Sequence, residues 1–324
     1  IVVGTHALLT TDVVFSNIAV SIVDEQHRFG VHQRATLRNK RDDDKTVPHT
    51  LVMTATPIPR TLSLTIFGDL DVSTISGLPP GRSPITTRLV QPEDASKVYS
   101  YFRKLIDKGQ QGYVVVPLVE DTDSGMKAVL SHAQHLERDY FQGRRVAFVH
   151  GRMKSEEREQ TMSAFREGKV DVLVATTVIE VGVDVANATI MVIEHADRFG
   201  LAQLHQLRGR VGRGELPGVC ALIASPTTND AIERLNAIVE TTDGFRIAER
   251  DLEIRGPGEL FGAKQSGIAP FKSARLPRDL ELLRMARRNA VECIQNDPLL
   301  KNAELLRKRL LQKYGETLGL GDVA

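Results

Sequence analysis

Two acidic residues stand where an apolar stretch of the sequence ends. Residues 18–23 form a β-branched run that predicts a buried strand, and Asp24 and Glu25 follow it directly, with His27 close behind. In open α/β sheets, ligands bind at the carboxyl ends of the strands. An aspartate there can hold Mg²⁺ through water while the adjacent glutamate orients the water that attacks a nucleotide triphosphate. For an isolated Asp-Glu pair, however, a solvated turn is the more common explanation.

A second strand-like run, residues 50–54, ends in small hydroxylated side chains. Thr54 and Thr56 flank Ala55, and Pro57 then stops the strand. Hydroxyls at a strand end can hydrogen-bond a neighbouring carboxylate while the chain turns. Taken alone, this is an ordinary turn between a strand and a helix. Its interest is that it stands one strand away from the acidic pair.

The run of residues 206–213 (QLRGRVGR) is rich in arginine. Its last six residues hold three arginines and two glycines, which is poor material for a packed helix interior. Arginine grips phosphate through a planar fork and can stabilise charge on a transferring phosphoryl group. Glycine allows another backbone to approach closely. We therefore expect the arginines of this run to contact phosphate, in preference to the alternative of an exposed basic helix end.

Residues 175–184 (ATTVIEVGVD) follow another buried strand-like run, residues 171–175. The hydroxyls of Thr176 and Thr177 and the backbone amides around Gly182 can contact nucleic-acid phosphates. Asp184 can accept a hydrogen bond from a ribose or from Arg210. Without the other motifs, this segment is simply a strand turning into a loop.

Short apolar runs alternate with helical patterns over most of the chain, and this alternation positions the residues above. Near-continuous apolar runs predict strands that are buried on both faces of a parallel sheet covered by helices. The alternation predicts an α/β fold wound by right-handed crossovers. One helix is expected to start with Ser155 as its N-cap and to bury Met162 and Phe165. The runs are residues 18–23, 50–54, 113–119, 145–149, 171–175, 189–194 and 219–224.

A proline-rich segment, residues 78–84 (LPPGRSP), is the best candidate for a linker, because it can continue neither a helix nor a central strand. It predicts three regions. Residues 1–80 resemble the back half of a domain, and residues 81–243 a complete one. Residues 244–324 hold a glycine-rich segment followed by two helical stretches, residues 278–295 and 299–314.

The composition is that of an ordinary globular protein of about two domains, with 324 residues of which 41% are hydrophobic and 26% charged. Lys plus Arg (42) against Asp plus Glu (41) leaves +1, so contact with nucleic acid must come from a local patch. Two cysteines exclude a disulfide framework and a CxxC metal site, and they fit a reducing compartment. The longest apolar stretch is too short to span a bilayer. Secreted and membrane proteins are excluded, and the lack of a G-x-S-x-G motif disfavours an α/β hydrolase.

In their order and spacing, these motifs resemble those of superfamily 2 helicases and translocases. The resemblance assigns residues 4–8 (GTHAL) to motif Ib, 24–27 to motif II, 54–56 to motif III, 176–184 to motif V and 206–213 to motif VI. Residues 248–267 resemble the translocation motif shared by the RecG family of branched-DNA helicases and the transcription-repair coupling factors. The Arg-Gly-Pro-Gly-Glu form at 255–259, Phe271-Lys272 and the helix from Arg278 favour the RecG family.

The resemblance implies RecA-like P-loop NTPase lobes with ATP and Mg²⁺ between them, plus a helical C-terminal segment. It implies catalytic roles for Asp24, Glu25, Gln206, Arg210 and Arg213, with Mg²⁺ held through water by Asp24 and Glu25. It implies cofactor-binding roles for His27, Gly182, Asp184 and Gly209. It implies DNA-binding or coupling roles for Thr5, His6, Thr54, Thr56, Thr176, Thr177, Arg255 and Gln265.

The implied activity is that of an ATP-dependent DNA helicase that translocates on double-stranded DNA. Its implied substrates are stalled forks and Holliday junctions, in recombination and repair. A monomer in the bacterial cytoplasm, associated with the nucleoid and partnered by single-stranded DNA-binding protein, is expected. Two alternatives stay open: a coupling-factor translocase, which displaces stalled RNA polymerase, and a catalytically inert DNA-binding module, whose DNA affinity would not respond to ATP.

The front of the chain departs from the family pattern. No G-x-x-x-x-G-K-[ST] motif occurs, and Gly168-Lys169 is followed by Val170 without a glycine-rich approach. The wedge domain of the family is missing too. The chain opens with Ile1-Val2-Val3, strand-like sequence without an initiator Met. We therefore expect a piece of a longer polypeptide that is inactive on its own.

Overall fold

The computed structural model describes residues 1–10, 13–15, 18–25, 48–54, 71–75, 84–117, 123–176, 185–255 and 279–314. The chain divides into two compact units. One comprises Ile1–Pro59 and Thr74–Ile268, and the other Arg60–Ser73 and Ala269–Ala324. The domain boundaries expected at residues 80 and 243 remain predictions.

The N-terminal part of the first unit holds a small parallel sheet. A short 3-10 helix, η1 (His6–Leu9), comes first, and then β1 (Val20–Val23) and β2 (His49–Val52) pair in parallel, with Val23 opposite Val52. The backbone N–H of Met53 extends the ladder by donating to the carbonyl of Val23 at 2.8 Å. Both strands were expected from the sequence, within one or two residues of these bounds.

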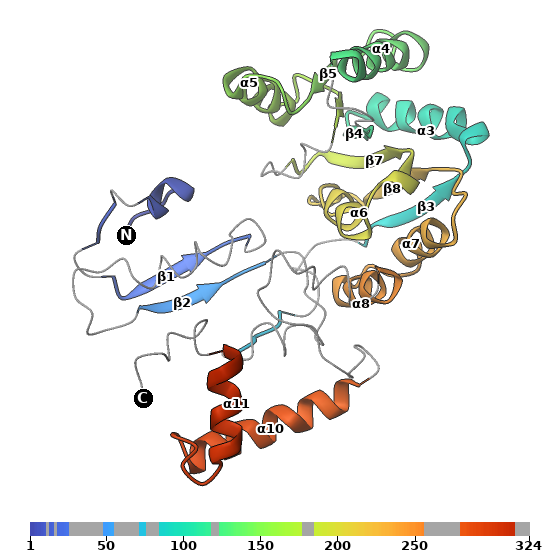
Figure 1. Cartoon of the computed structure of the whole chain (residues 1–324). Helices are drawn as coiled ribbons and strands as arrows, with labels where there is room; N and C mark the ends of the chain where they lie inside the picture. The colour runs from blue at the N-terminus through green and yellow to red at the C-terminus, as the bar shows by residue number, and fades with distance from the viewer. Residues whose placement is uncertain are drawn as a thin grey trace. The chain divides into compact units, whose positions relative to one another are not determined.

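A six-stranded parallel sheet forms the centre of the first unit (Figure 1). Its strand order is β3-β8-β7-β4-β6-β5, and every neighbouring pair is parallel. The expectation of a parallel α/β sheet is therefore confirmed. The strands are β3 (Thr86–Val90), β4 (Gln111–Val115), β5 (Val146–Val149), β6 (Val172–Ala175), β7 (Ala188–Glu194) and β8 (Val219–Ile223).

The sequence did not predict β3, because β3 is an edge strand that is only partly buried and carries Thr and Arg side chains. Such a strand lacks the continuous apolar run that marks the central strands.

Helices cover both faces of this sheet. The face that carries Val114 and Val192 packs against α3 (Ala95–Asp107) and α4 (Asp123–Asp139). The other face packs against four further helices, of which α6 carries the arginine-rich run. They are α5 (Ser155–Arg166), α6 (Leu201–Arg208), α7 (Asn229–Glu240) and α8 (Gly244–Arg255); two short 3-10 helices, η3 (Pro92–Asp94) and η5 (Ala196–Arg198), join the elements.

One local expectation about α5 is wrong. Ser155 is the first residue of the helix, and Lys154 precedes it as the N-cap without a side-chain hydrogen bond. Met162 and Phe165 are buried as expected, because they lie three positions apart on the face turned to the sheet. Burial of this face, rather than a capping hydroxyl, stabilises α5.

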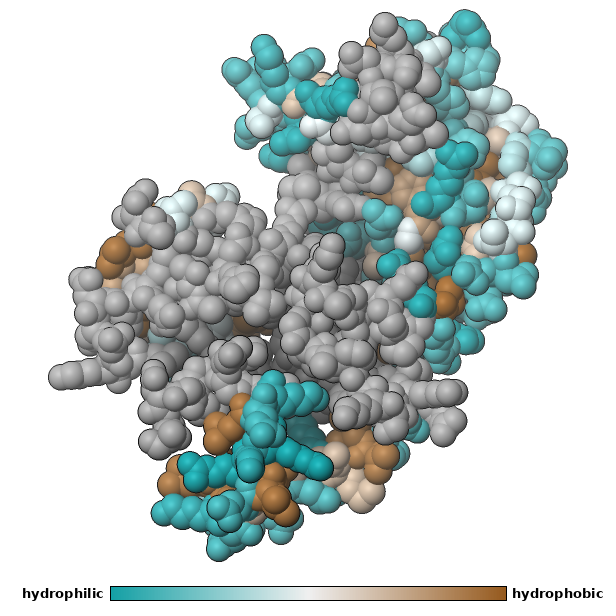
Figure 2. All heavy atoms as spheres, in the orientation of Figure 1, coloured by the Kyte–Doolittle hydropathy of each residue, from teal (hydrophilic) through white to brown (hydrophobic). Residues whose placement is uncertain are grey.

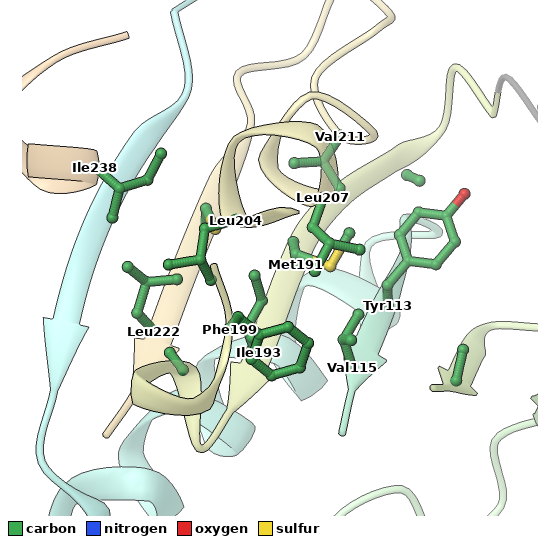
Figure 3. Packing of buried hydrophobic residues seen from close by; sticks show 14 of the residues in the cluster. Tyr113, Val115, Met191, Ile193, Phe199, Leu204, Leu207, Val211, Leu222 and Ile238 are labelled. Carbon is green, nitrogen blue, oxygen red and sulfur yellow. The ribbon is translucent and has the colours of Figure 1, made fainter. Parts of the chain in front are cut away.

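Helix α6 is fixed in place by apolar contacts on the central strands (Figure 3). Leu204 and Leu207 lie with Met191 and Ile193 of β7 in one cluster, and all four are completely buried. Each such side chain contributes about 1.5–3 kcal/mol when it leaves water. The end of α6, where the arginine-rich run continues, is therefore held firmly against the sheet.

The second unit contains α10 (Leu280–Asn296) and α11 (Glu304–Tyr314). Two helices were expected here, and both are present, although the second begins five residues later than predicted. Asp297 accepts a hydrogen bond from the backbone N–H of Asn302 at 2.7 Å, which shapes the turn between them. Several large apolar side chains on these helices are exposed, and apolar surface shows among the polar residues there (Figure 2).

Within the described residues, no helix has both the length and the apolarity that crossing a membrane requires.

Candidate functional site

The acidic pair and Thr54 lie at one edge of the small sheet. Asp24 and Glu25 leave β1 at its carboxyl end, and Thr54 follows β2 at the same edge, because the two strands are parallel and in register there. The side chain of Asp24 accepts a hydrogen bond from the backbone N–H of Glu25 at 2.8 Å. Glu25 has a left-handed backbone with φ of 53°. The acidic pair and Thr54 therefore follow the ends of two neighbouring parallel strands, as expected from the sequence.

The arginine-rich run begins inside α6 and ends in a turn. Gln206 lies in the last turn of α6, Gly209 caps the helix, and its N–H donates to the carbonyl of His205 at 3.0 Å. Arg213 folds back, so that its Nε donates to the carbonyl of Gly209 at 3.0 Å. Arg210 and Arg213 are both half-buried. The two guanidinium groups thus follow directly from a helix end that is packed on the sheet.

This turn lies at the amino-terminal edge of the sheet. The backbone N–H of Gly212 donates to the carbonyl of Ala188, the first residue of β7, at 3.1 Å. Gly212 has φ of +65°, and a Cβ there would come within 3.1 Å of the Cα of Gly218. Glycine is therefore required for its conformation and for the close approach of the next strand. The expectation of close backbone contact in this run is confirmed at Gly212.

Of the six residues expected to be unsuited to a helix interior, only Arg208 belongs to α6, and the other five lie beyond its end. Arg208 is the last residue of α6 and is only 2% exposed. Its Nη1 donates to the carbonyls of Ile238 and Thr241 at 2.7 and 2.8 Å, at the end of α7. Arg208 is therefore a structural residue that joins α6 to α7, whereas Arg210 and Arg213 lie beyond the helix.

His205 contributes to the same anchor. Its Nδ1 lies 3.0 Å from Nη2 of Arg208, which as a guanidinium can only donate, so the histidine accepts. Burial lowers the pKa of His205 to about 4, and the neighbouring Arg208 charge acts in the same direction. Burial also lowers the pKa of Arg208. At neutral pH, His205 is an uncharged acceptor that orients the arginine.

Thr176 lies at the opposite edge of the sheet from Arg210. It follows the carboxyl end of β6, its N–H donates to the carbonyl of Val149 at 3.3 Å, and it is 1% exposed. A hydroxyl buried to this degree suits positioning of the following segment better than direct contact with a phosphate. The described chain resumes at Val185, three residues before β7 begins at the amino edge. Thr176 therefore leaves the sheet at the carboxyl edge, and Val185 returns to it at the amino edge.

Other expected site residues are placed only in part. Thr5 caps η1, its hydroxyl accepting from the N–H of Ala7 at 3.5 Å, and His6 is the first residue of η1. The remaining six expected site residues, His27, Thr56, Thr177, Gly182, Asp184 and Gln265, lie outside the described residues.

Arg255 lies where α8, which holds the start of the translocation motif, meets α6, which holds the start of motif VI. It is the last residue of α8, and its Nε donates to the carboxylate of Asp251 at 3.0 Å. Burial raises the pKa of Asp251, although Arg255 opposes this effect. A Cβ on Gly200, immediately before α6, would lie 2.9 Å from Nη2 of Arg255. The guanidinium therefore sits over the amino end of the helix whose other end carries Arg210 and Arg213.

The sequence reasoning missed the arginines around Arg255. A pocket of about 350 Å³ is lined by Arg198, Arg234 and Arg255 together with Asp230 and Gly200, among other residues. Arg198 follows the carboxyl end of β7, so the strand-end rule that found Asp24 could have found it. Arg234 lies within α7, and no sequence signal distinguishes it from any other helical arginine.

Comparison with known proteins agrees with this arrangement. The model of the "Helicase conserved C-terminal domain" matches residues 97–215, which hold most of the six-stranded sheet. The model of "ATP-dependent DNA helicase RecG, domain 3, C-terminal" matches residues 241–316, which include α8, α10 and α11. The second match decides between the helicase families that the motifs resemble. The chain belongs to the RecG family.

Individual relatives cover nearly the whole chain. The ATP-dependent DNA helicase RecG of Synechocystis sp. is 47% identical over 98% of this chain and 38% of its own length. That of Thermotoga maritima is 49% identical over 90% of this chain and 37% of its own. The chain thus spans less than half the length of these RecG relatives.

Solved structures give the same result. A structure of RecG bound to a three-way DNA junction matches 87% of this chain and 35% of its own, with 45% identity and a TM-score of 0.65. The helicase MrfA bound to DNA is 16% identical over 83% of this chain and 39% of its own, with a TM-score of 0.52, and supports the fold alone. The matches to RecG favour that family over the coupling factors.

Proposed function

We propose that this chain is the motor portion of an ATP-dependent helicase that translocates on branched double-stranded DNA. In this proposal, one sheet edge supplies metal- and water-binding groups, and the turn after α6 supplies arginines for the transferring phosphate. The observation that carries the proposal is the anchored end of α6. Arg208 and His205 fix the helix, and Arg210 and Arg213 follow at once with little freedom to move away.

The residues of this chain are suited to bind ATP and Mg²⁺, but they supply only some of the groups that a complete site needs. Carboxylate oxygens are ligands that Mg²⁺ prefers, and Mg²⁺ usually keeps several waters and bonds only one or two carboxylates besides phosphate oxygens. Asp24 and Glu25 suit such a site. Among the described residues, no group of three or more His, Cys, Asp or Glu side chains gathers that could hold a metal on its own.

Within the site, the proposed roles are distinct. Asp24 binds the hydrated Mg²⁺, which would neutralise charge on the phosphates, and Glu25 orients and deprotonates the attacking water. The hydroxyl of Thr54 hydrogen-bonds a neighbouring carboxylate at this edge of the sheet. Arg210 and Arg213, assisted by Gln206 and Gly209, stabilise the charge that develops on the transferring phosphate.

We further propose that Arg255 transmits movement of α6 to the segment that follows α8. Three observations support it: the guanidinium lies over Gly200, Asp251 holds it from α8, and α6 is rigidly packed at its far end. A shift of the phosphate-contacting turn then moves Arg255. The substrates proposed for the intact protein are forks and Holliday junctions, and the structure of RecG bound to a three-way DNA junction supports branched DNA as the substrate class.

The test of this function is substitution of the motif VI arginines in the intact protein. Arg213→Ala, or Arg210→Ala, should lower DNA-stimulated ATP turnover by about a thousandfold, with nucleotide affinity changed much less. Lysine at either position should rescue poorly, because an ammonium cannot reproduce the planar fork.

Arg246→Ala is the matched control, since Arg246 is an exposed arginine of α8 remote from the run in sequence. Its turnover should equal that of the parent protein. Unchanged turnover in both motif VI alanine variants would contradict the proposal and leave the run as a basic surface.

A further inference from the structure

The pocket beside α6 is the strongest unassigned feature of the described chain. It lies where η5, the amino end of α6, α7 and the end of α8 meet, and it encloses about 350 Å³. Three of its lining side chains are arginines, against one carboxylate, Asp230. Phosphate is the group that arginine's planar fork matches best.

The hydrogen bonding of these arginines leaves donors available. Nη2 of Arg234 donates to the carbonyl of Asp197 at 3.0 Å, but its Nε is buried and has no hydrogen-bond partner among the described residues. A buried donor without an acceptor costs about 1–3 kcal/mol. The side chain of Arg198 is exposed, and it makes no hydrogen bond or ion pair to any other residue in the described ranges. The site therefore has unused donors at both its inner and its outer wall.

The charge balance around the pocket favours an anion. Arg255 is already paired with Asp251, and Asp230 offsets one further positive charge. The side chains that line the pocket, taken together with Asp251, therefore leave one arginine charge uncompensated. A single phosphodiester, with one negative charge and two free oxygens, matches this excess.

The position of the pocket relates it to the proposed function. Arg198 belongs to the turn that leaves β7 at its carboxyl end, and Thr176 leaves β6 at the same edge of the sheet. Motif V, which begins at Thr176, is the segment that the sequence predicts to contact nucleic-acid phosphates, although Thr176 itself is buried. Arg198 of the pocket therefore lies at the same sheet edge as Thr176, with one strand, β4, between β7 and β6.

We propose that Arg198, Arg234 and Arg255 form a pocket that binds one backbone phosphate of the DNA. Arg198 contacts the phosphate from outside and Arg234 through its buried Nε. This inference rests on the proposed function, because it takes the phosphate from nucleic acid. It adds a DNA contact beside the α6–α8 junction, where the backbone phosphate is gripped next to the helix that carries the motif VI arginines.

The experiment measures the affinity of the intact protein for a labelled forked duplex by fluorescence anisotropy over a range of KCl concentrations. Each phosphate contact contributes a slope of about −0.9 to the dependence of log K on log salt. Arg198→Ala should therefore reduce the steepness of the slope by about 0.9 and weaken binding several-fold, equally for forks of different sequence. Arg198→Lys should keep the slope, since it keeps the charge.

Arg246→Ala serves as the control, because Arg246 is an exposed arginine of α8 that neither lines the pocket nor belongs to the translocation motif. It should keep the parent slope. A slope for Arg198→Ala equal to that of Arg246→Ala would overturn the pocket, as would a loss seen in ATP affinity with DNA binding unchanged. Both results differ from failure of the proposed function, in which the parent protein itself would not bind the fork.

Discussion

Arg208 and Arg213 are five residues apart in one run, yet they have different surroundings. The first is buried and donates to two carbonyls at the end of α7, and the second folds over Gly209 at a partly open turn. The sequence could not separate them, because composition gives the same weight to every arginine. What separates them is where α6 ends, a boundary that sequence patterns locate poorly. His205, beside Arg208, likewise had no motif to mark it.

Arg208→Met should destabilise the protein. The substitution keeps most of the side-chain volume but leaves the buried bond to the Ile238 carbonyl and the partly buried bond to the Thr241 carbonyl without their donor. We therefore expect a loss of about 3 kcal/mol in the free energy of unfolding. Urea denaturation of the intact protein measures it. Arg213→Ala is the matched comparison and should cost clearly less, because its guanidinium is partly open to water. Equal losses would mean that Arg208 is not a structural anchor.

The stability of this region should fall as the pH falls. Burial lowers the pKa of His205 to about 4, whereas an unfolded histidine titrates near 6.5. Between these values the unfolded state binds the proton and the folded state does not, so acid favours unfolding. The full effect, reached near pH 4, is about 3 kcal/mol. Above pH 6.5 it vanishes.

His205→Asn isolates this contribution, because the amide oxygen can still accept from Arg208 but does not titrate. Denaturation midpoints of the parent and the variant, compared at pH 7 and pH 5, should show a smaller loss in the variant. Other titrating groups act in both proteins and cancel in the difference. Parallel losses would show that His205 is not the responsible group.

At the scale of elements, periodicity and strand-end rules predicted most of the framework. The central strands were expected because they are apolar on both faces, and α10 and α11 because their helical patterns follow a glycine-rich segment. Edge strand β3 was missed, since an edge needs no continuous apolar run. The placement of Asp24 and Thr54 at one edge of the small sheet could be predicted, because they follow neighbouring parallel strands. The pocket beside α6 could not be predicted, because its arginines come from three elements that only the fold brings together.

Breaking the contact between α8 and α6 should abolish DNA movement while ATP hydrolysis largely continues. Arg255→Ala in the intact protein should retain much of the ATPase and lose no more than the several-fold DNA affinity of one phosphate contact, while strand displacement collapses. Gly200→Ala should show a milder form of this effect, because its Cβ would press against Nη2 of Arg255 and displace that guanidinium. Hydrolysis and unwinding are measured on the same forked substrate.

Arg246→Ala again provides the control on the same helix and should unwind normally. Equal loss of hydrolysis and unwinding in Arg255→Ala would assign Arg255 to the ATP site or to the fold. Full unwinding would leave it without a coupling role.

At the scale of the whole molecule, the described parts correspond to a helicase C-terminal lobe, a small sheet that carries the acidic pair, and a helical unit. The RecG relatives are more than twice as long as this chain, so the activity proposed here is that of the longer protein. Motif VI is complete in this chain, whereas the phosphate-cradling motif does not occur in its sequence. In the proposed function, this combination would supply charge stabilisation for hydrolysis without the loop that holds the nucleotide.

The 324-residue chain on its own should therefore not turn over ATP. The backbone amides and lysine of a G-x-x-x-x-G-K-[ST] loop normally hold the β- and γ-phosphates in line with the attacking water, and no other run in this sequence provides them. A steady-state ATPase assay with forked DNA, run beside the intact protein, measures this. The chain must first show cooperative unfolding, so that inactivity is not mistaken for misfolding. DNA-stimulated turnover close to that of the intact protein would contradict the prediction, because it would require a phosphate cradle built from residues that the sequence does not mark. Background turnover that Arg213→Ala leaves unchanged would agree with it, because the arginine acts only on a nucleotide that is already held in place.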